Sequence, residues 1–306
     1  MQFVRFAAAQ GGNPRLGVLT PRGVLDLATG LDLHHLAQGH EPLALPDSPA
    51  DLFRPENADL LALVRTVTDW ALDNARLQPL FLQRDSVRLL APVGRPPKIL
   101  CIGLNYRDHC IEQGHAIPKT PVVFAKFGTA VCDPDAPVRR PRVTRELDYE
   151  AELGVVIGRG GRHIAEERAL EHVAGYLNFN DVTARDLQRL DGQWVRAKSC
   201  DTFAPMGPAL VTADEVPDPQ NLAIRCRVNG QVVQESNTNQ MIFTVAHLVS
   251  FASEFTTLET GDVIATGTPP GVGVWRKPPQ FLQPGDRVEV EIEGLGVLRN
   301  PVEEEE

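Results

Sequence analysis

Two glutamates that enter an apolar strand constrain this chain more than any other feature. Glu150 and Glu152 stand at the start of a short apolar run, residues 153–157, which Gly158 closes. A run of this length and composition is typical of a buried strand. Because side chains alternate along a strand, both carboxylates lie on the same face. At ~4 Å and an effective dielectric of ~20, such a pair repels by roughly 4 kcal/mol, so the fold needs a positive charge nearby.

A hard metal cation is one way to supply that charge. Mg²⁺ is typically held by a few carboxylates and keeps open positions for water or substrate. Asp181 directly follows a second apolar segment, residues 173–180, and offers a third oxygen ligand. The Glu-x-Glu pattern alone is also compatible with unrelated charges at a solvated strand end. The metal hypothesis therefore depends on the rest of the chain.

The bulk composition excludes several classes of protein. The chain has 306 residues, 42% of them hydrophobic, and a formal net charge of −10. This length allows a substantial core. The acidic balance argues against a surface for nucleic acid or for an anionic membrane. No apolar run reaches the ~18 residues of a transmembrane helix, so no membrane partner is expected.

The cysteines and the first residues indicate an intracellular protein. The five cysteines are odd in number and include no Cys-x-x-Cys pair. That usage is typical of reduced thiols and not of a zinc site or a disulfide framework. Residues 1–10 lack the apolar stretch of a secretory signal. We expect the cytoplasm, or the mitochondrial matrix if a transit peptide has been removed.

The patterns predict a β-rich α+β protein in three parts. Residues 1–91 read as a small N-terminal α+β domain with an amphipathic helix at 58–75. A proline-rich joint at 91–98 leads into the catalytic domain, residues 92–302. Residues 303–306 form an acidic tail that we expect to be disordered. The expected N-terminal strands are residues 2–8, 15–19 and 23–27.

Strands also dominate the second domain. Asn229-Gly230 between two apolar runs is a strong hairpin signal, and residues 244–255 have the periodicity of a helix. The order of elements is not an alternating βαβ array. The expected strands are residues 99–104, 122–126, 153–157, 174–179, 222–228, 231–235, 263–266 and 287–292. In the N-terminal domain, three histidines are expected in a solvated polar loop: His34, His35 and His40.

A histidine–glutamate pair and two lysines follow or lie in these strands and are candidates for the site. His109 and Glu112 are three residues apart, so in a helical turn they share a face. A carboxylate beside an imidazole fixes its tautomer and raises its basicity, as water activation requires; an ordinary surface pair is the alternative. Lys126 lies inside an apolar stretch, where its ammonium either reaches solvent or faces an anionic site. Lys198 is a further cation near the same motifs.

A helix and a loop complete the candidate site. Arg185 and Gln188 are three residues apart on one predicted helical face. Arginine can bind a carboxylate bidentately and glutamine can hydrogen-bond a carbonyl; surface polarity of the helix is the alternative. The polar stretch 186–193 could be mobile, like a lid. The Gly-rich loop 265–274 lacks a phosphate-loop signature, but its N–H groups and the Thr268 hydroxyl could cradle a carboxylate. A tight turn between strands is the plain alternative.

Four motifs in order resemble the fumarylacetoacetate hydrolase superfamily over about residues 92–300. They are Gly-Leu-Asn-Tyr-x-x-His at 103–109, Asp-Tyr-Glu-x-Glu-Leu at 148–153, Asn-Asp-Val-Thr-Ala-Arg-Asp-x-Gln at 180–188 and Thr-Gly-Thr-Pro-Pro-Gly-Val-Gly at 266–273. The N-terminal unit and residues 274–279 look most like one subgroup, whose members are implicated in oxaloacetate keto–enol tautomerisation. The founding hydrolases have a further aspartate near Lys126, which this chain lacks; that difference favours a three-carboxylate site.

The resemblance implies a mixed β-roll and a homodimer. It implies Mg²⁺, with Mn²⁺ or Ca²⁺ as alternatives, on Glu150, Glu152 and Asp181. It assigns catalysis to His109, Glu112 and Lys198. Substrate contacts fall on the residues Lys126, Arg185, Gln188 and Thr268.

We interpret the chain as an enzyme that acts on small 2-oxo or β-diketo acids through a metal-bound enolate, with oxaloacetate tautomerase as the first choice. A hydrolase that cleaves a C–C bond and an oxaloacetate decarboxylase use the same enolate and stay open. A non-catalytic binding protein that kept the fold is the competing class; the complete triad and dyad argue against it.

Overall fold

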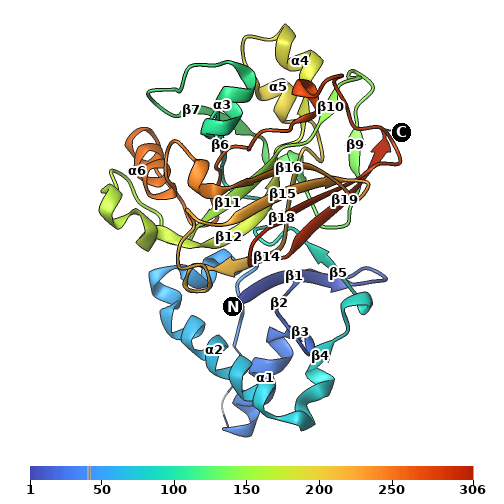
Figure 1. Cartoon of the computed structure of the whole chain (residues 1–306). Helices are drawn as coiled ribbons and strands as arrows, with labels where there is room; N and C mark the ends of the chain where they lie inside the picture. Colours follow the sequence, from blue (N-terminus) through green and yellow to red (C-terminus); the bar gives the residue numbers. More distant parts are fainter. Residues whose placement is uncertain (40, 42, 306) are drawn as a thin grey trace.

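The computed structural model describes residues 1–39, 41 and 43–305 (Figure 1). A sheet of twelve strands runs through the molecule in the order β4-β3-β2-β1-β14-β12-β11-β17-β6-β7, with β5 paired to β1 and β8 to β14. Its N-terminal strands are β1 Gln2–Ala8, β2 Arg15–Thr20, β3 Gly23–Asp26, β4 Phe81–Leu82 and β5 Val87–Leu90. The other seven are β6 Ile99–Gly103, β7 Val122–Lys126, β8 Val131–Cys132, β11 Ala151–Ile157, β12 Val173–Asn180, β14 Ala204–Thr212 and β17 Val263–Ala265.

A second sheet of five strands packs on the first. It has the order β16-β15-β18-β19-β9, and its strands contact β11, β12 and β14. Every residue of β11 and β12 is buried, as expected of central strands covered on both faces. The five strands are β9 Val138–Arg140, β15 Ala223–Val228, β16 Gln231–Asn237, β18 Arg287–Ile292 and β19 Val297–Glu304. A short pair, β10 Leu147–Asp148 and β13 Thr183–Ala184, stands beside the site.

Six α-helices surround the sheets in the part of the chain that the structure describes: α1 Leu27–Ala37, α2 Ala58–Asp73, α3 Arg107–Gln113, α4 Arg185–Leu190, α5 Val195–Lys198 and α6 Val245–Phe255. The helix predicted at 58–75 is α2, and the one at 244–255 is α6, which Thr244 caps with its side chain. Within the described ranges, no helix combines the length and the apolar character that crossing a membrane takes. The predicted β-rich α+β class is confirmed.

The hairpin between β15 and β16 turns where the sequence predicts it. Asn229 and Gly230 both have positive φ, 52° and 79°, as the favoured two-residue turn requires. The large sheet continues across the predicted domain boundary, because β1 pairs antiparallel with β14. The division at residues 91 and 92 stays a prediction.

Two expectations are wrong. Glu303 and Glu304 are not disordered: they extend β19 and pair with Arg139 and Arg140 of β9, whose positive charges offset theirs. His34 and His35 lie in the last turn of α1 and not in a loop. The ring of His34 packs edge-on against Trp70 at 5.1 Å, so packing between α1 and α2 outweighs local polarity. His40 falls outside the described residues.

Candidate active site

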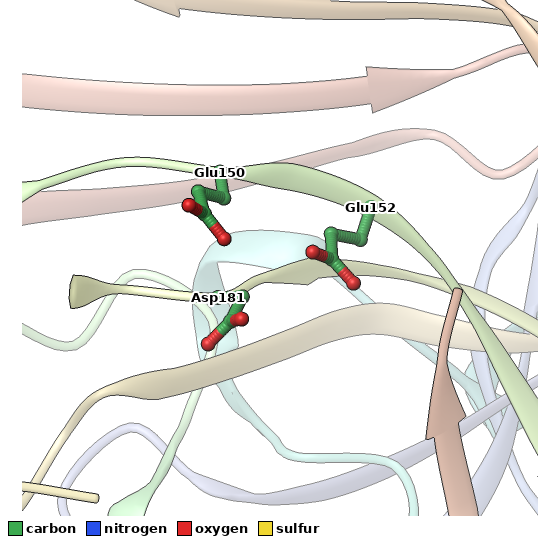
Figure 2. Close-up of side chains that lie close together, drawn as sticks. All are labelled: Glu150, Glu152 and Asp181. Carbon is green, nitrogen blue, oxygen red and sulfur yellow. The ribbon is translucent and has the colours of Figure 1, made fainter. Parts of the chain in front are cut away.

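Three carboxylates meet where two neighbouring strands end. Glu150 directly precedes β11, Glu152 lies within it, and Asp181 directly follows β12. Antiparallel pairing of Ala151 with Asn180 brings these ends together, and the Asp181 N–H donates to the Glu150 carbonyl at 2.9 Å. Figure 2 shows the three carboxylates turned toward a common space. One ligand oxygen from each lies within 4.8 Å of the others, and all three residues are buried.

Two buried lysines hold this cluster. The Lys198 ammonium donates to Glu150 Oε2 and to Asp181 Oδ2, both at 2.6 Å. Lys126 donates to the other oxygen of Asp181 and to the Val182 carbonyl. The question left open for Lys126 is answered, because its ammonium faces an anionic site.

Charge is distributed unequally over the two glutamates. Burial, together with Asp181 and Glu150, raises the pKa of Glu152 well above its usual value. Burial opposes ionisation of Glu150 too, but Lys198 and Arg185 outweigh it and lower the pKa of Glu150. Glu152 is therefore the carboxylate that lacks a countercharge.

Arg185 links the cluster to a further carboxylate. Its Nε donates to Asp148 at 2.8 Å, one terminal nitrogen donates to Glu150, and the other donates to Gln188 at 3.0 Å. The expectation that Arg185 and Gln188 share a face is confirmed. Asp148 is fully buried and also accepts the N–H groups of Gly273, at 2.7 Å, and of Val274. Sequence reasoning assigned Asp148 no role, although it opens the motif that holds Glu150.

The expected histidine–glutamate pair forms on α3. His109 Nδ1 lies 3.0 Å from Glu112 Oε2. A carboxylate only accepts, so Nδ1 carries a proton and donates it to Glu112. The Gln113 amide contacts the other ring nitrogen, Nε2, a partner that the sequence motif did not reveal. The second oxygen of Glu112 accepts the Gly271 N–H at 2.9 Å.

The Gly-rich loop binds carboxylates that belong to the protein itself. The N–H groups of Gly267, Gly271 and Gly273 donate to Glu152, Glu112 and Asp148 respectively. A Cβ at Gly273 would lie 2.5 Å from the Asp148 carboxylate, so only glycine allows this approach. The Thr268 hydroxyl donates to the Ala151 carbonyl and accepts from Gln234. The loop thus positions the acids of the site.

These groups surround one cavity of about 340 Å³. Seven of the ten predicted site residues line it: His109, Glu150, Glu152, Arg185, Gln188, Lys198 and Thr268. Asp181 and Glu112 do not line it but contact Lys198 and His109, which do, and Lys126 is joined to Lys198 through Asp181. The remaining lining includes side chains that sequence reasoning missed: Gln113, His115, Phe124, Arg189, Trp194 and Trp275. Of these, Trp194 could have been found from the sequence, because it lies four residues before Lys198.

The donor set fits a divalent cation. All three candidate ligands are carboxylates, which hard ions such as Mg²⁺ and Ca²⁺ prefer. Burial, and then Asp181 and Glu150, raise the pKa of Glu152, so a cation at its oxygens would offset the cost of its charge. The triad could therefore bind one divalent ion beside the cavity.

Known proteins are similar to this chain in sequence and in architecture. A family model described as "Fumarylacetoacetate (FAA) hydrolase C-terminal" matches residues 98–303. The chain belongs to the fumarylacetoacetate hydrolase family. It is an enzyme of the isomerase or C–C hydrolase type, and the resemblance seen in its four motifs is confirmed.

Relatives within the family include both types. The chain is 46% identical over 304 residues to "Oxaloacetate tautomerase fahd2, mitochondrial" of Xenopus laevis, which covers 99% of this chain and 90% of the relative. Among solved structures, fumarylacetoacetate hydrolase from Exiguobacterium antarcticum is 36% identical with a TM-score of 0.77. A 5-carboxymethyl-2-hydroxymuconate delta-isomerase from Mycobacterium smegmatis is 32% identical with a TM-score of 0.73. Both alignments cover 100% of each chain.

Proposed function

We propose that this enzyme is an oxaloacetate keto–enol tautomerase that uses Mg²⁺ held by Glu150, Glu152 and Asp181. The observation that carries the proposal is the meeting of these three buried carboxylates at a cavity that Lys198 and Arg185 also line. The Xenopus laevis relative, which matches nearly the whole chain, supports the choice of reaction.

A divalent ion held by these three carboxylates would supply positive charge that stabilises negative charge on the 2-oxo oxygen of the substrate. Lys198 reaches the cavity and touches both Glu150 and Asp181. Asp181 and Glu150 outweigh the effect of burial and raise the pKa of Lys198, so it stays protonated. It can deliver a proton to C3 of the enol and recover one from the enol hydroxyl through these carboxylates.

The second carboxylate of oxaloacetate has a partner in Arg185. Three of the five N–H groups of its guanidinium are engaged by Asp148, Glu150 and Gln188. The other two have no hydrogen-bond partner among the described residues and are available to an anionic ligand. With a divalent ion bound, the cluster carries net positive charge, so it selects dicarboxylates.

C–C hydrolysis of acylpyruvates is the runner-up, because His109 and Glu112 form the hydrogen-bonded pair that water activation needs. Decarboxylation of oxaloacetate uses the same charged groups. One parallel assay with Mg²⁺ and with EDTA separates the three reactions: decay of enol-oxaloacetate, release of CO₂, and cleavage of an acylpyruvate. Brisk acylpyruvate cleavage without tautomerase activity would replace our choice with the runner-up.

We further propose a homodimer, as the family resemblance implies, in the mitochondrial matrix or the cytoplasm. The relative named above is called mitochondrial. Light scattering that gives the mass of one chain would contradict the dimer. Imaging of the tagged protein tests the compartment, and secretion of the protein would contradict both proposed locations.

A further inference from the structure

Three aromatic side chains line the same cavity as the charged groups, and we call them the aromatic wall. We define it as Phe124 on β7, Trp194 directly before α5, and Trp275 at the end of the 3-10 turn Gly273–Trp275. The rings of Phe124 and Trp194 pack edge to face with centroids 5.3 Å apart. Both are half-buried, and Trp275 is 43% exposed. The reaction proposed above gives these rings no task, because oxaloacetate is polar at both ends.

The wall stands within a small molecule's length of the carboxylates. The Lys198 ammonium lies 5.0 Å from the centroid of the Phe124 ring and 2.6 Å from Glu150 and Asp181. Trp194 and Lys198 are one helical turn apart, joined by a backbone hydrogen bond of 3.0 Å, so their side chains share a face. One short helix thus presents an indole and an ammonium to the same cavity.

The chain makes specific room for Trp194. A Cβ built on Gly103 would lie 2.7 Å and 3.1 Å from two carbons of the indole, so a side chain there would displace the ring. The cavity of about 340 Å³ falls in the ~300–1,000 Å³ range of pockets that hold drug-sized ligands. It therefore has space for a ring beside a 2-oxo acid.

We propose that the site also tautomerises arylpyruvates, 2-oxo acids with an aromatic ring on C3. This inference rests on the proposed tautomerase chemistry and adds a substrate class to it. The end of the cavity that Glu150 and Glu152 line binds the 2-oxo acid group, and the aromatic wall binds the ring. The enol O–H bond breaks and a C3–H bond forms, while the C2–C3 double bond becomes single and the C2–O bond becomes C=O. No oxidant or co-reactant takes part.

The test follows the decay of enol-phenylpyruvate and of enol-oxaloacetate by absorbance, on the full chain with Mg²⁺. Trp194→Ala should lower kcat/KM for phenylpyruvate about tenfold, about 1.4 kcal/mol, and change that for oxaloacetate less than about twofold. Leu190→Ala is the matched control, because this exposed apolar residue of the same segment does not line the cavity; both rates should persist. Equal losses for both substrates in Trp194→Ala would overturn the role of the wall.

A binding measurement on the wild-type enzyme is independent of whether Trp194→Ala folds. Benzoylformate is a 2-oxo acid that cannot enolise, and glyoxylate is the same acid without the ring. Calorimetry should give benzoylformate at least tenfold tighter binding, about 1.4 kcal/mol; equal affinities overturn the inference. If the enzyme tautomerises oxaloacetate but not phenylpyruvate, the inference is wrong and the proposed function stands. If the enzyme tautomerises phenylpyruvate but not oxaloacetate, the proposed function is wrong and the inference stands.

Discussion

At the residue scale, Glu150 and Glu152 should respond in opposite ways to loss of charge. Glu152 lacks a countercharge and has a raised pKa, through burial and then Asp181. Its ionisation destabilises the metal-free fold as the pH rises from the unfolded pKa through the folded one. Glu152→Gln should therefore stabilise the metal-free protein at alkaline pH, by ~1.4 kcal/mol for each unit of the shift, and abolish the stabilisation that Mg²⁺ adds.

Glu150→Gln is the matched comparison. The pKa of Glu150 is lowered despite burial, since Lys198 and Arg185 outweigh it. Its charge stabilises the fold above the unfolded pKa, and that stability is lost as the pH falls through the folded pKa. The variant should cost roughly 3 kcal/mol or more and also weaken Mg²⁺ binding. Denaturant titrations with and without Mg²⁺ measure both effects. Retention of full Mg²⁺ affinity and turnover in either variant would sink the metal assignment.

Arg185 should act on anionic substrates selectively. Arg185→Ala is expected to raise the Michaelis constant for oxaloacetate at least tenfold, about 1.4 kcal/mol, and to affect a neutral diketone far less. Arg189→Ala removes the same charge from the cavity rim, but that guanidinium is engaged by Glu146, so a change of less than about twofold is expected. Steady-state kinetics on both substrates measure the difference. Equal losses for the two substrates would refute carboxylate binding by Arg185.

At the scale of elements, α3 allows the two reaction types to be separated. Water attack needs the base that His109 and Glu112 provide, whereas tautomerisation needs charge stabilisation and a proton relay. His109→Ala combined with Glu112→Ala should abolish any acylpyruvate cleavage, by a factor of about 10² or more, and leave measurable enol-oxaloacetate decay. Glu112→Gln is the control for the contact between α3 and the Gly-rich loop, because its amide oxygen can still accept the Gly271 N–H. If the double variant loses both activities while it still binds Mg²⁺, the dyad serves both reactions.

At the scale of the whole molecule, the acidic end of the chain should contribute to stability. Glu303 and Glu304 pair with β9, and Glu304 binds Arg140 at 2.8 Å. A chain that ends at Val302 should lose about 1–2 kcal/mol of unfolding free energy and keep its kcat. A chain that ends at Glu305 is the control and should match the full protein. Thermal unfolding of the three forms measures this; identical midpoints would mean that the pairing carries no energy.

The limits of sequence reasoning are clear at particular residues. Glu150, Glu152, His109 and Glu112 could be placed because their spacing within one element fixes which face they share. Asp148 was missed because its partner Arg185 meets it only once β10 and β13 have paired. Gln113 was missed although it lies one helical turn after His109, a spacing that the sequence shows. The tail was misjudged, since its charge was visible and its partner Arg140, far away in sequence, was not.

The sequence by itself determined the β-rich class, the strand that carries Glu150 and Glu152, the α3 pair and the family. These depend on local periodicity and on motifs, which pairing across the sheet does not alter. Only the tertiary structure decided that Lys126 and Lys198 neutralise Asp181 and that the Gly-rich loop binds the acids of the protein itself. It also decided that Trp194 faces the same cavity. Contacts of this kind join residues far apart in the chain, and their geometry exists only once the strands have paired.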